Sequence, residues 1–336
     1  MSRTTKGRST AVGLLSVAAI ATATGCASSA ASTPTQTTGS GKVVVGALSN
    51  GAGREATLTV KPVASIRAQL PAAVRKSGKL VIGEGALPAG FPPLAYVGTD
   101  HQTLTGAEPD LGRLVAAVLG LKPEVTNATW ENLFVGIDSG KTDVGFSNIT
   151  DTEERKQKYD FACYRKDNLA FEQLASSDWK FGGDYRNLSG KRVAVGSGTN
   201  QEKILLSWQK KLRAAGKKLT IVHYPDQNAT NLALASGRID LYFGPNPGVQ
   251  YDVTQSAHTN RPTRNAGQWS GAGASLQGLI CATSKKGDGL AKPVAAAIDH
   301  LIRTGDYGKW LAAWNLSNEA VKTAAINPPG LPLSDS

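Results

Sequence analysis

Two short stretches of this chain match each other. Residues 139–146 read SGKTDVGF and residues 236–243 read SGRIDLYF. Each follows a helical pattern, at residues 130–137 and 231–235, and each leads into a polar or turn-rich segment. A helix closed by Ser-Gly, followed by Asp and an apolar strand, is half of a βαβ unit. The repetition predicts two similar α/β lobes with a cleft between them.

The N-terminal residues have the features of an export signal. Residues 1–25 combine three basic residues with an apolar run at 11–20 that is too short to span a bilayer. The small residues before Cys26 resemble a bacterial lipobox, whose cysteine receives diacylglycerol; ordinary signal cleavage beside an incidental cysteine is the alternative. We expect a lipoprotein signal peptide at residues 1–25 and a lipid anchor at Cys26 on the extracytoplasmic face of the cell membrane.

The next region is rich in Ser, Thr, Ala and Gly, and we expect residues 26–62 to be the lipidated N-terminus and a flexible tether. The remaining chain is long enough for two lobes. Removing the three basic residues before Cys26 lowers the formal charge from +11 to +8, and such a basic protein can touch anionic lipid or cell-wall polymer. No run of Lys and Arg alternates with aromatic residues, which favours solvated surface lysines and excludes nucleic acid as a partner.

Cysteine and histidine usage bounds the chemistry further. Cys163 and Cys281 remain after the anchor residue, and an even number of cysteines in an exported protein permits a disulfide; two buried free thiols are the alternative. The four histidines are scattered, and neither His-Glu-x-x-His nor Cys-x-x-Cys occurs. We therefore expect no metal site and no cofactor.

Predicted helices and strands alternate along the chain, which favours mostly parallel sheets covered on both faces. A strand at 192–195, a Gly-rich turn at 196–200 and a helix at 201–212 follow one another. Such a turn presents unpaired N–H groups to an anion. The third glycine of a dinucleotide fingerprint and the Gly-Lys-Ser/Thr of a P-loop are both missing, so a small anionic group is expected there.

Residues 147–156, SNITDTEERK, form the sharpest local signal. A strand ends at Phe146, and Thr150 with Glu153 has the spacing of a capping box at the start of a helix. Arg155 lies one turn inside that helix, so N–H groups, hydroxyls and a guanidinium converge on one point that suits a carboxylate. A capped surface helix with its arginine in water is the alternative.

At this point the sequence resembles the amino-acid-type (family 3) solute-binding proteins of ABC importers. The resemblance extends over residues 70–316. The motifs that carry it are residues 80–83 (LVIG), 91–93 (FPP), 106–111 (GAEPDL), 130–133 (WENL), 150–156 (TDTEERK), 160–161 (DF), 190–195 (GKRVAV), 198–201 (GTNQ) and 305–307 (GDY) with Trp310.

The resemblance implies an α/β fold of two Rossmann-like lobes with mostly parallel sheets, joined by two crossover strands: the type II periplasmic-binding-protein fold. Lobe 1 comprises residues 63–165 and 277–330, and lobe 2 comprises residues 166–276. Cys163 and Cys281 then both fall near the hinge on the lobe 1 side, and we predict that they form a disulfide.

The resemblance also implies a ligand site. The ligand's α-carboxylate is expected to meet the guanidinium of Arg155, the backbone beside Thr150 and the turn at Thr199 and Asn200. Fixed donors then hold the charged end while apolar walls exclude water. The aromatic residues expected to stack on the ligand's side chain are Phe91 and Trp130.

The α-ammonium has several candidate partners. The resemblance implies that it meets the carbonyl of Asn148 and an acidic residue five positions after the Asp of the second-lobe strand. That position is Pro245, which has no side-chain acceptor. Asn246, Glu84 or Glu108 is expected to compensate; alternatively, the ligand lacks a free ammonium group.

The functional prediction is a monomeric extracytoplasmic receptor that captures a small polar solute by hinge closure and delivers it to an ABC-transporter permease. The solute is expected to be an amino acid or another carboxylate, and no bond is made or broken. The alternatives are an enzyme on the same scaffold, a dehydratase or cell-wall lyase using Glu84 or Glu108 as acid or base, and a ligand-sensing surface lipoprotein.

Overall fold

The computed structural model describes residues 37–38 and 41–335. The predicted signal peptide, Cys26 and residues 27–36 and 39–40 of the expected tether lie outside the described residues. Within residues 41–335, no helix has the length and apolar composition needed to cross a membrane.

The secondary structure alternates between strands and helices. The strands are β1 (Thr37–Thr38), β2 (Lys42–Val45), β3 (Ala56–Thr59), β4 (Lys79–Leu87), β5 (Tyr96–Val97), β6 (Leu104–Thr105), β7 (Lys122–Thr129), β8 (Val144–Gly145), β9 (Tyr159–Leu174), β10 (Arg192–Ala194), β11 (Thr220–Val222), β12 (Leu241–Pro245), β13 (Thr263–Ser270), β14 (Gly278–Lys285) and β15 (Ala325–Ile326). The α-helices are α1 (Ala64–Arg67), α2 (Ala72–Ser77), α3 (Ala107–Leu119), α4 (Trp130–Ser139), α5 (Asn200–Ala214), α6 (Gln227–Ala235), α7 (Asn246–Ser256), α8 (Ala291–Thr304) and α9 (Asp306–Ala313). Short 3₁₀ turns are η1 (Arg155–Gln157), η2 (Tyr185–Leu188), η3 (Ser317–Glu319) and η4 (Leu333–Asp335).

Among the described residues, a 10-stranded mixed sheet has the order β11-β10-β12-β9-β14-β8-β4-β7, with β13 and β15 also paired to β9. The pairs β4–β7, β4–β8, β10–β11 and β10–β12 are parallel, whereas every pair that includes β9 or β14 is antiparallel. The predicted α/β class is confirmed. Parallel pairing is confined to the two ends of the sheet, where helices connect the strands.

The repeated sequence has the same structure in both places. Gly140 and Gly237 follow their helices with φ angles of 74° and 73°, a left-handed conformation that glycine adopts without strain. The carboxylate of Asp143 accepts a hydrogen bond from Val81 N at 2.7 Å, and that of Asp240 accepts one from Arg192 N at 2.7 Å. Each Asp therefore fastens its own strand to the start of the neighbouring parallel strand.

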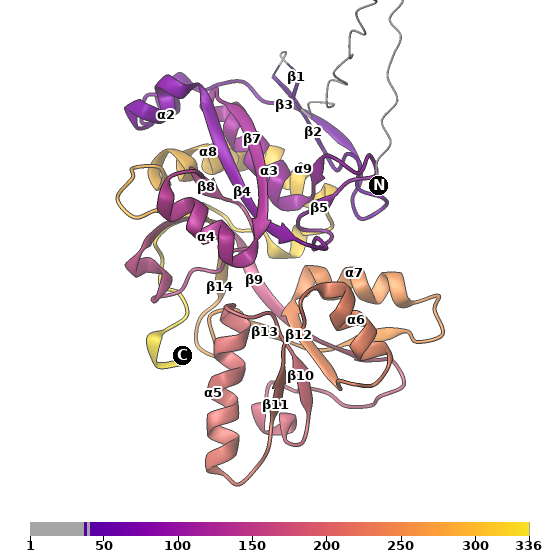
Figure 1. Ribbon diagram of the computed structural model, residues 1–336. Helices are drawn as coiled ribbons and strands as arrows, with labels where there is room; N and C mark the ends of the chain where they lie inside the picture. Colours follow the sequence, from indigo (N-terminus) through magenta and orange to yellow (C-terminus); the bar gives the residue numbers. More distant parts are fainter. Residues whose placement is uncertain (1–36, 39–40, 336) are drawn as a thin grey trace, which may run out of the picture. The chain divides into compact units, whose positions relative to one another are not determined.

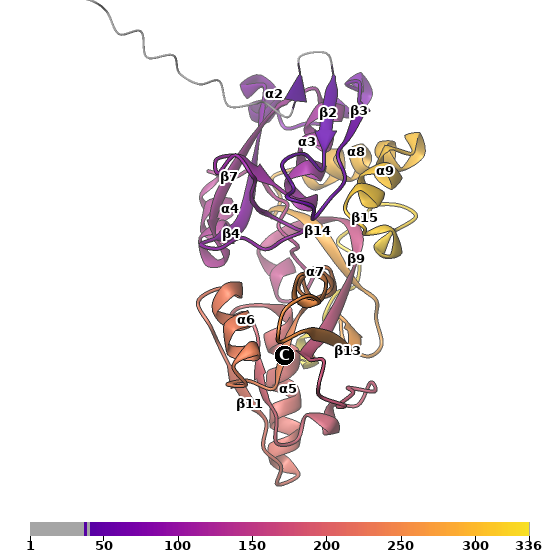
Figure 2. The same ribbon diagram turned by 90° about the vertical axis from the view of Figure 1, so that its right-hand side faces the viewer.

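Strand β9 passes through both lobes without interruption (Figures 1 and 2). Its residues 159–167 pair with β14, and its residues 168–174 pair with β13. Lobe 1 packs its core on helices α3, α8 and α9. Lobe 2 packs an aromatic core, in which Phe171 stacks on Phe243 with ring centroids 4.2 Å apart.

The expected tether is wrong for its last residues, because β2 and β3 form an ordered hairpin packed on lobe 1. Val43 and Val45 are fully buried, and Gly46 N donates to the Asp110 carboxylate at 2.8 Å. This hairpin covers α3, whose residues are all buried. Helix α3 is therefore enclosed on all sides, unlike a surface helix with one polar face.

The C-terminal segment crosses from lobe 1 to lobe 2. Strand β15 pairs with β9 at Cys163 and Ala162, and Leu331 then packs in the apolar cluster of lobe 2. The backbone of Leu331 also bonds to a loop of lobe 1. Leu331 N donates to Asp151 O at 3.2 Å, and Glu153 N donates to Leu331 O at 3.0 Å. The segment therefore holds the loop at residues 151–153 in place.

We expect Asp143→Ala and Asp240→Ala each to lower the free energy of unfolding by about 1–3 kcal/mol, because each leaves a strand N–H without its acceptor. Urea unfolding measures the change. Asp178→Ala is the matched control, since Asp178 is exposed and its side chain makes no hydrogen bond within the described residues. Equal losses in all three variants would show that the Asp side chains do not fasten the strands.

Candidate functional site

A cavity of about 420 Å³ lies between the two lobes. Lobe 1 contributes the end of β4, the loop after it and the start of α4; lobe 2 contributes the turn before α5, the start of α6 and the end of β12. The polar and aromatic residues in its wall include Phe91, Glu108, Trp130, Glu131, Ser147, Asn148, Thr199, Asn200, Tyr224, Asp226, Gln227 and Tyr242. A cavity of this size suits a small molecule.

The structure brings most of the predicted site residues to this cavity. Those that line it are Phe91, Trp130, Asn148, Thr199 and Asn200. Those that lie outside its wall are Thr150, Arg155 and Asn246. Pro245, where an acidic residue was expected, also lines the cavity.

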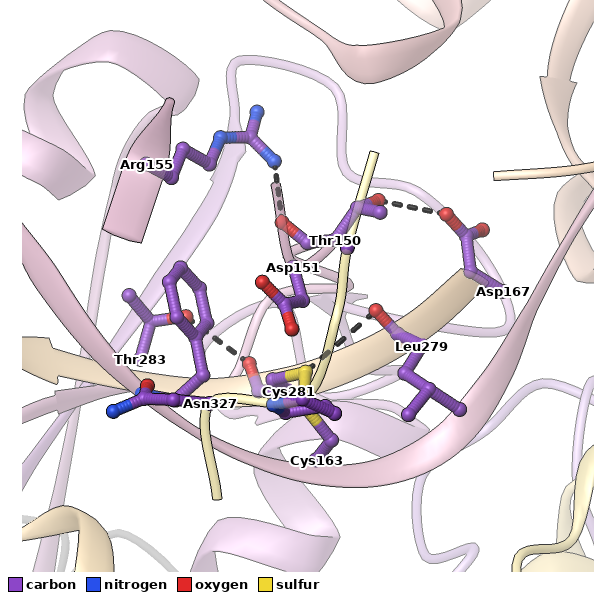
Figure 3. The surroundings of a disulfide bond; sticks show 12 residues. Thr150, Asp151, Arg155, Cys163, Asp167, Leu279, Cys281, Thr283 and Asn327 are labelled. Atoms are coloured by element: carbon purple, nitrogen blue, oxygen red, sulfur yellow. Dashed lines mark hydrogen bonds between the residues drawn. A yellow bond between two sulfur atoms is a disulfide. The ribbon is translucent and has the colours of Figure 1, made fainter. Parts of the chain in front are cut away.

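Arg155 lies beside the cavity and contacts both lobes. Its guanidinium donates to Thr150 O at 2.9 Å (Figure 3), and it also donates to Gly198 O at 3.2 Å. Its central carbon lies 5.4 Å from the ring centroids of both Trp130 and Phe134. Burial lowers the pKa of Arg155 to about 10, so the side chain stays charged at neutral pH. Two carbonyls, one from each lobe, therefore occupy the guanidinium.

The backbone around Arg155 also differs from the prediction. The expected helix is a single 3₁₀ turn, and Thr152 Oγ1, not Thr150, accepts from Arg155 N at 3.1 Å. Glu153 instead contacts Lys156 and Gly330 N. The capping box is therefore wrong, because the hydroxyl of Thr150 has a different partner.

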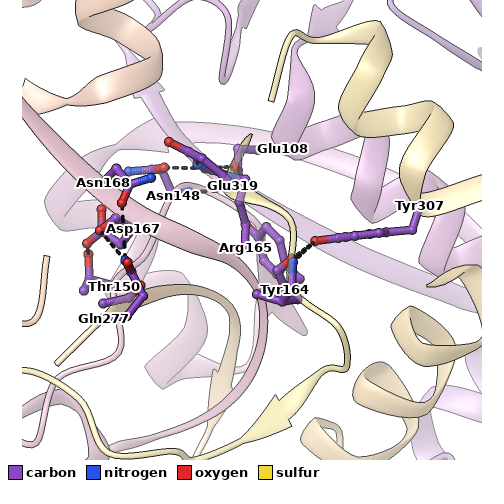
Figure 4. A network of polar contacts seen from close by, with 12 residues as sticks. Glu108, Asn148, Thr150, Tyr164, Arg165, Asp167, Asn168, Gln277, Tyr307 and Glu319 are labelled. Carbon is purple, nitrogen blue, oxygen red and sulfur yellow. Dashed lines mark hydrogen bonds and ion pairs between the residues drawn. The ribbon is translucent and has the colours of Figure 1, made fainter. Parts of the chain in front are cut away.

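That partner is Asp167, a buried carboxylate on β9. Thr150 Oγ1 donates to Asp167 Oδ2 at 2.8 Å (Figure 4), and Asn200 Nδ2 donates to the same oxygen at 3.1 Å. Asn200 Nδ2 also donates to Gly271 O at 3.0 Å. The side chains of Thr150 and Asn200, both predicted to bind the ligand, therefore bind Asp167. Asn200 also lines the cavity.

A second buried network lies under the cavity floor. Arg165 on β9 forms ion pairs with Glu108, at 2.8 Å, and with Glu319 (Figure 4). Glu108 also accepts from Asn148 N at 3.1 Å and from the Tyr164 hydroxyl. Although burial alone lowers the pKa of Arg165, the carboxylates of Glu319 and Glu108 raise it above its ordinary value. Glu108 is therefore held rigidly in the wall.

Glu84 lies behind this wall and does not line the cavity. It is fully buried, and neither of its carboxyl oxygens has a hydrogen-bond partner among the described residues. Burial, assisted by the nearby carboxylate of Glu108, raises the pKa of Glu84 well above its ordinary value. Because Glu84 does not line the cavity, this geometry gives no support to the expectation that Glu84 replaces the missing ammonium acceptor.

The Gly-rich turn before α5 carries its own acid. The carboxylate of Glu202 accepts from Gly198 N at 2.7 Å, and its other oxygen contacts His223 Nε2 at 2.5 Å. Thr199 Oγ1 accepts from Glu202 N at 3.2 Å. The capping-box spacing expected at residue 150 is thus found at residue 199, where it occupies one of the N–H groups predicted to meet an anion.

Asn246 begins α7 and does not line the cavity. Its side-chain oxygen accepts from Gln268 Nε2 at 3.1 Å and from Asn265 Nδ2 at 3.3 Å, both on β13. Asn246 therefore lies outside the candidate site.

Cys163 and Cys281 are joined in a disulfide between β9 and β14 (Figure 3). The carboxylate of Asp151 lies beside it, and one oxygen of Asp151 and the two sulfurs all lie within 4.8 Å of one another. Both sulfurs are used by the disulfide, so this group does not form a metal site. Burial raises the pKa of Asp151 to about 7, although Lys156 Nζ lies 3.6 Å from it.

Several residues of the site were missed from the sequence. Asp167 and Arg165 belong to a polar run, residues 165–168, between the mostly apolar stretches 161–164 and 169–171 of the same strand. That interruption was a usable signal of buried, paired charges. Asp226 caps α6 by accepting from Ala229 N at 2.8 Å, a role that an Asp directly before a helical pattern indicates.

Comparison with known proteins decides the family. Residues 86–317 match the model of the bacterial extracellular solute-binding proteins, family 3. The chain belongs to this family. A family 3 protein is the component of an ABC importer that captures the solute outside the cytoplasm. The N-terminal hairpin of β2 and β3 lies before the matched region.

Relatives and solved structures agree with this assignment. The chain is 29% identical to the arginine-binding protein ArgT of Corynebacterium glutamicum over 272 residues, which cover 79% of this chain and 84% of that protein. It is 27% identical to the L-cystine-binding protein TcyJ of Escherichia coli, with 71% and 85% covered. An ancestral arginine-binding protein bound to arginine superposes with a TM-score of 0.60 at 24% identity, covering 70% of this chain and 98% of that one. The type II periplasmic-binding-protein fold is confirmed.

We expect the stability of this family 3 protein to fall as pH rises from about 4 to about 7 through Asp151. Its folded-state pKa is raised to about 7, so the native state keeps a proton that the unfolded chain has released. Asp151→Asn removes this effect, and the variant should gain about 1–3 kcal/mol relative to the wild type between pH 5 and pH 8.

Thermal unfolding at both pH values measures the gain. Glu55→Gln, which changes an exposed acid, is the control. A difference between Asp151→Asn and wild type that is the same at pH 5 and pH 8 would contradict the raised pKa.

Proposed function

We propose that this chain is a lipid-anchored receptor of an ABC importer and that it captures an amino acid between its lobes by hinge closure. The observation that carries the proposal is the cavity walled by both lobes. A solute that contacts both walls stabilises the closed form relative to the open one, and this difference drives closure. The arginine- and cystine-binding relatives support an amino acid as the solute.

The proposal assigns binding without catalysis. The candidate acids of the alternative enzyme, Glu84 and Glu108, support this. Glu84 lies behind the wall, and Glu108 is held by Arg165, Tyr164 and Asn148 N. A general acid or base must reach the solute to exchange a proton with it. Mass spectrometry of solute released from the protein should therefore recover it unchanged.

The proposed anchor is the thiol of Cys26, which lies outside the described residues. Export by the signal peptide and lipidation of Cys26 would hold the receptor at the membrane that contains its permease partner. We propose that it acts there as a monomer. The hairpin of β2 and β3 supports this arrangement, because it joins the anchored end of the chain to lobe 1 rather than to lobe 2.

Arg155 is the proposed partner of the solute's α-carboxylate. Its guanidinium contacts carbonyls from both lobes, Thr150 O and Gly198 O, at the edge of the cavity. A carboxylate is a stronger acceptor for a guanidinium than a neutral carbonyl. We expect the solute to displace Gly198 O, so that Arg155 changes partners as the lobes close around the ligand.

Isothermal titration with the common amino acids tests the function, and we expect at least one to bind at micromolar or tighter affinity. Arg155→Ala should then weaken binding by about 2–5 kcal/mol, which is roughly thirtyfold or more in Kd. Its effect on the unfolding of the empty protein should be smaller, about 1 kcal/mol, because only two hydrogen bonds to carbonyls are lost.

Arg186→Ala is the control, since Arg186 is exposed and pairs with Asp184 on the surface of lobe 2. Unchanged affinity in Arg155→Ala would remove Arg155 from the site. Absence of binding by every amino acid tested would refute the proposed function itself.

A further inference from the structure

The wall of the cavity between the lobes is unbalanced in charge. Its ionisable carboxyl groups belong to Glu108, Glu131 and Asp226. Among the residues that the structure describes, no Lys, Arg or His lines this cavity. The contrast with the rest of the chain is large, because the whole sequence carries a formal charge of +11.

The groups that offer positive charge near the cavity are already engaged. Arg155 donates to two carbonyls, and it supplies at most one carboxylate-binding position. Gly198 N at the turn before α5 donates to the carboxylate of Glu202. Under the floor, Arg165 is shared by Glu108 and Glu319, so one cation faces two carboxylates. An anionic side chain on the solute would therefore find no second partner.

The carboxylates of Glu131 and Asp226, in contrast, can accept further contacts. Glu131 lies in the first turn of α4 in lobe 1, is exposed, and forms no ion pair within the described residues. Asp226 lies in lobe 2, where one of its oxygens caps α6 and the other makes no hydrogen bond among the described residues. These two carboxylates lie on opposite lobes of the same cavity, so a cation held between them is attracted by both.

Aromatic rings complete the wall. Phe91 and Trp130 of lobe 1 and Tyr224 and Tyr242 of lobe 2 line the same cavity. The face of an aromatic ring attracts a cation that lies over it, and carboxylates nearby add to that attraction. Pro245 provides no acid at the position where the family places one, so the acids that remain are those of α4, α6 and the floor.

We infer that the solute carries net positive charge and that Glu131 and Asp226 select it. This inference rests on the proposed function and specifies the class of solute for the same cavity. The solute is a cationic amino acid: its carboxylate meets Arg155, and its two positive groups meet the acids of the wall. A neutral amino acid would leave one carboxylate without a counter-charge in the closed cavity.

The test compares solutes of nearly equal shape and different charge. Isothermal titration of the full chain with arginine, citrulline and glutamate is the central experiment, because citrulline replaces the guanidinium of arginine with a neutral urea group. We expect arginine to bind about a hundredfold or more tighter than citrulline and glutamate not to bind detectably. Agmatine, which lacks the carboxylate, should bind more weakly than arginine but should still bind.

Variants locate the selection within the wall. Asp226→Asn keeps a good helix cap, and Glu131→Gln changes an exposed residue, so both should fold. Each should weaken arginine binding about tenfold to hundredfold while changing citrulline binding by less than about threefold. Asp184→Asn is the matched control, since Asp184 caps η2 outside the cavity and loses the same charge.

The outcomes separate this inference from the proposed function. If citrulline or another neutral or anionic amino acid binds as tightly as arginine, the inference is wrong and the proposed function stands. If arginine binds but both variants bind it like wild type, Glu131 and Asp226 do not select the charge and the inference is again wrong. If no amino acid binds at all, the proposed function fails.

Discussion

The carboxylate of Asp167 joins the two lobes where β9 passes from one to the other. It accepts a hydrogen bond from Thr150 in lobe 1 and one from Asn200 at the start of α5 in lobe 2. Burial raises the pKa of Asp167, and these donors oppose that shift by favouring the ionised form. A buried carboxylate with partners on both sides fixes the position of α5 relative to the loop that carries Arg155. The position of α5 beside the cavity therefore depends on Asp167, although this residue does not line the cavity.

Arg165, two residues earlier on the same strand, stabilises the floor of the cavity in a similar way. It pairs with Glu108 in the cavity wall and with Glu319 after α9, so the C-terminal part of lobe 1 supports the solute site from behind. Removing one partner of such a buried pair leaves an uncompensated charge. The two networks together leave β9 little freedom within lobe 1. If the lobes close as proposed, we expect the change of angle in the strand residues beyond 167, which pair with β13 in lobe 2.

The repeated Ser-Gly-x-x-Asp pattern predicted two α/β lobes correctly because each Asp makes a local, reproducible contact with the next strand. The roles of Thr150 and Asn200 were not predictable, because both side chains bond to Asp167, which is distant from each in sequence. The hairpin of β2 and β3 was hidden in a Ser- and Gly-rich region for the same reason. Its ordering comes from Asp110, which lies 64 residues beyond Gly46. Local patterns thus identified elements, whereas distant contacts decided which side chains are available to a solute.

An acidic cavity in a basic protein limits where selection for charge can occur. The long-range field of a chain with a formal net charge of +11 repels a small cation. At physiological salt, however, charges farther away than about 8 Å are largely screened. A cation that reaches the cavity therefore responds mainly to Glu131, Asp226 and the aromatic walls. Because the field of the whole protein does not help, discrimination between arginine and a neutral amino acid must come from contacts made as the lobes close, and it should show in the dissociation rate more than in the association rate.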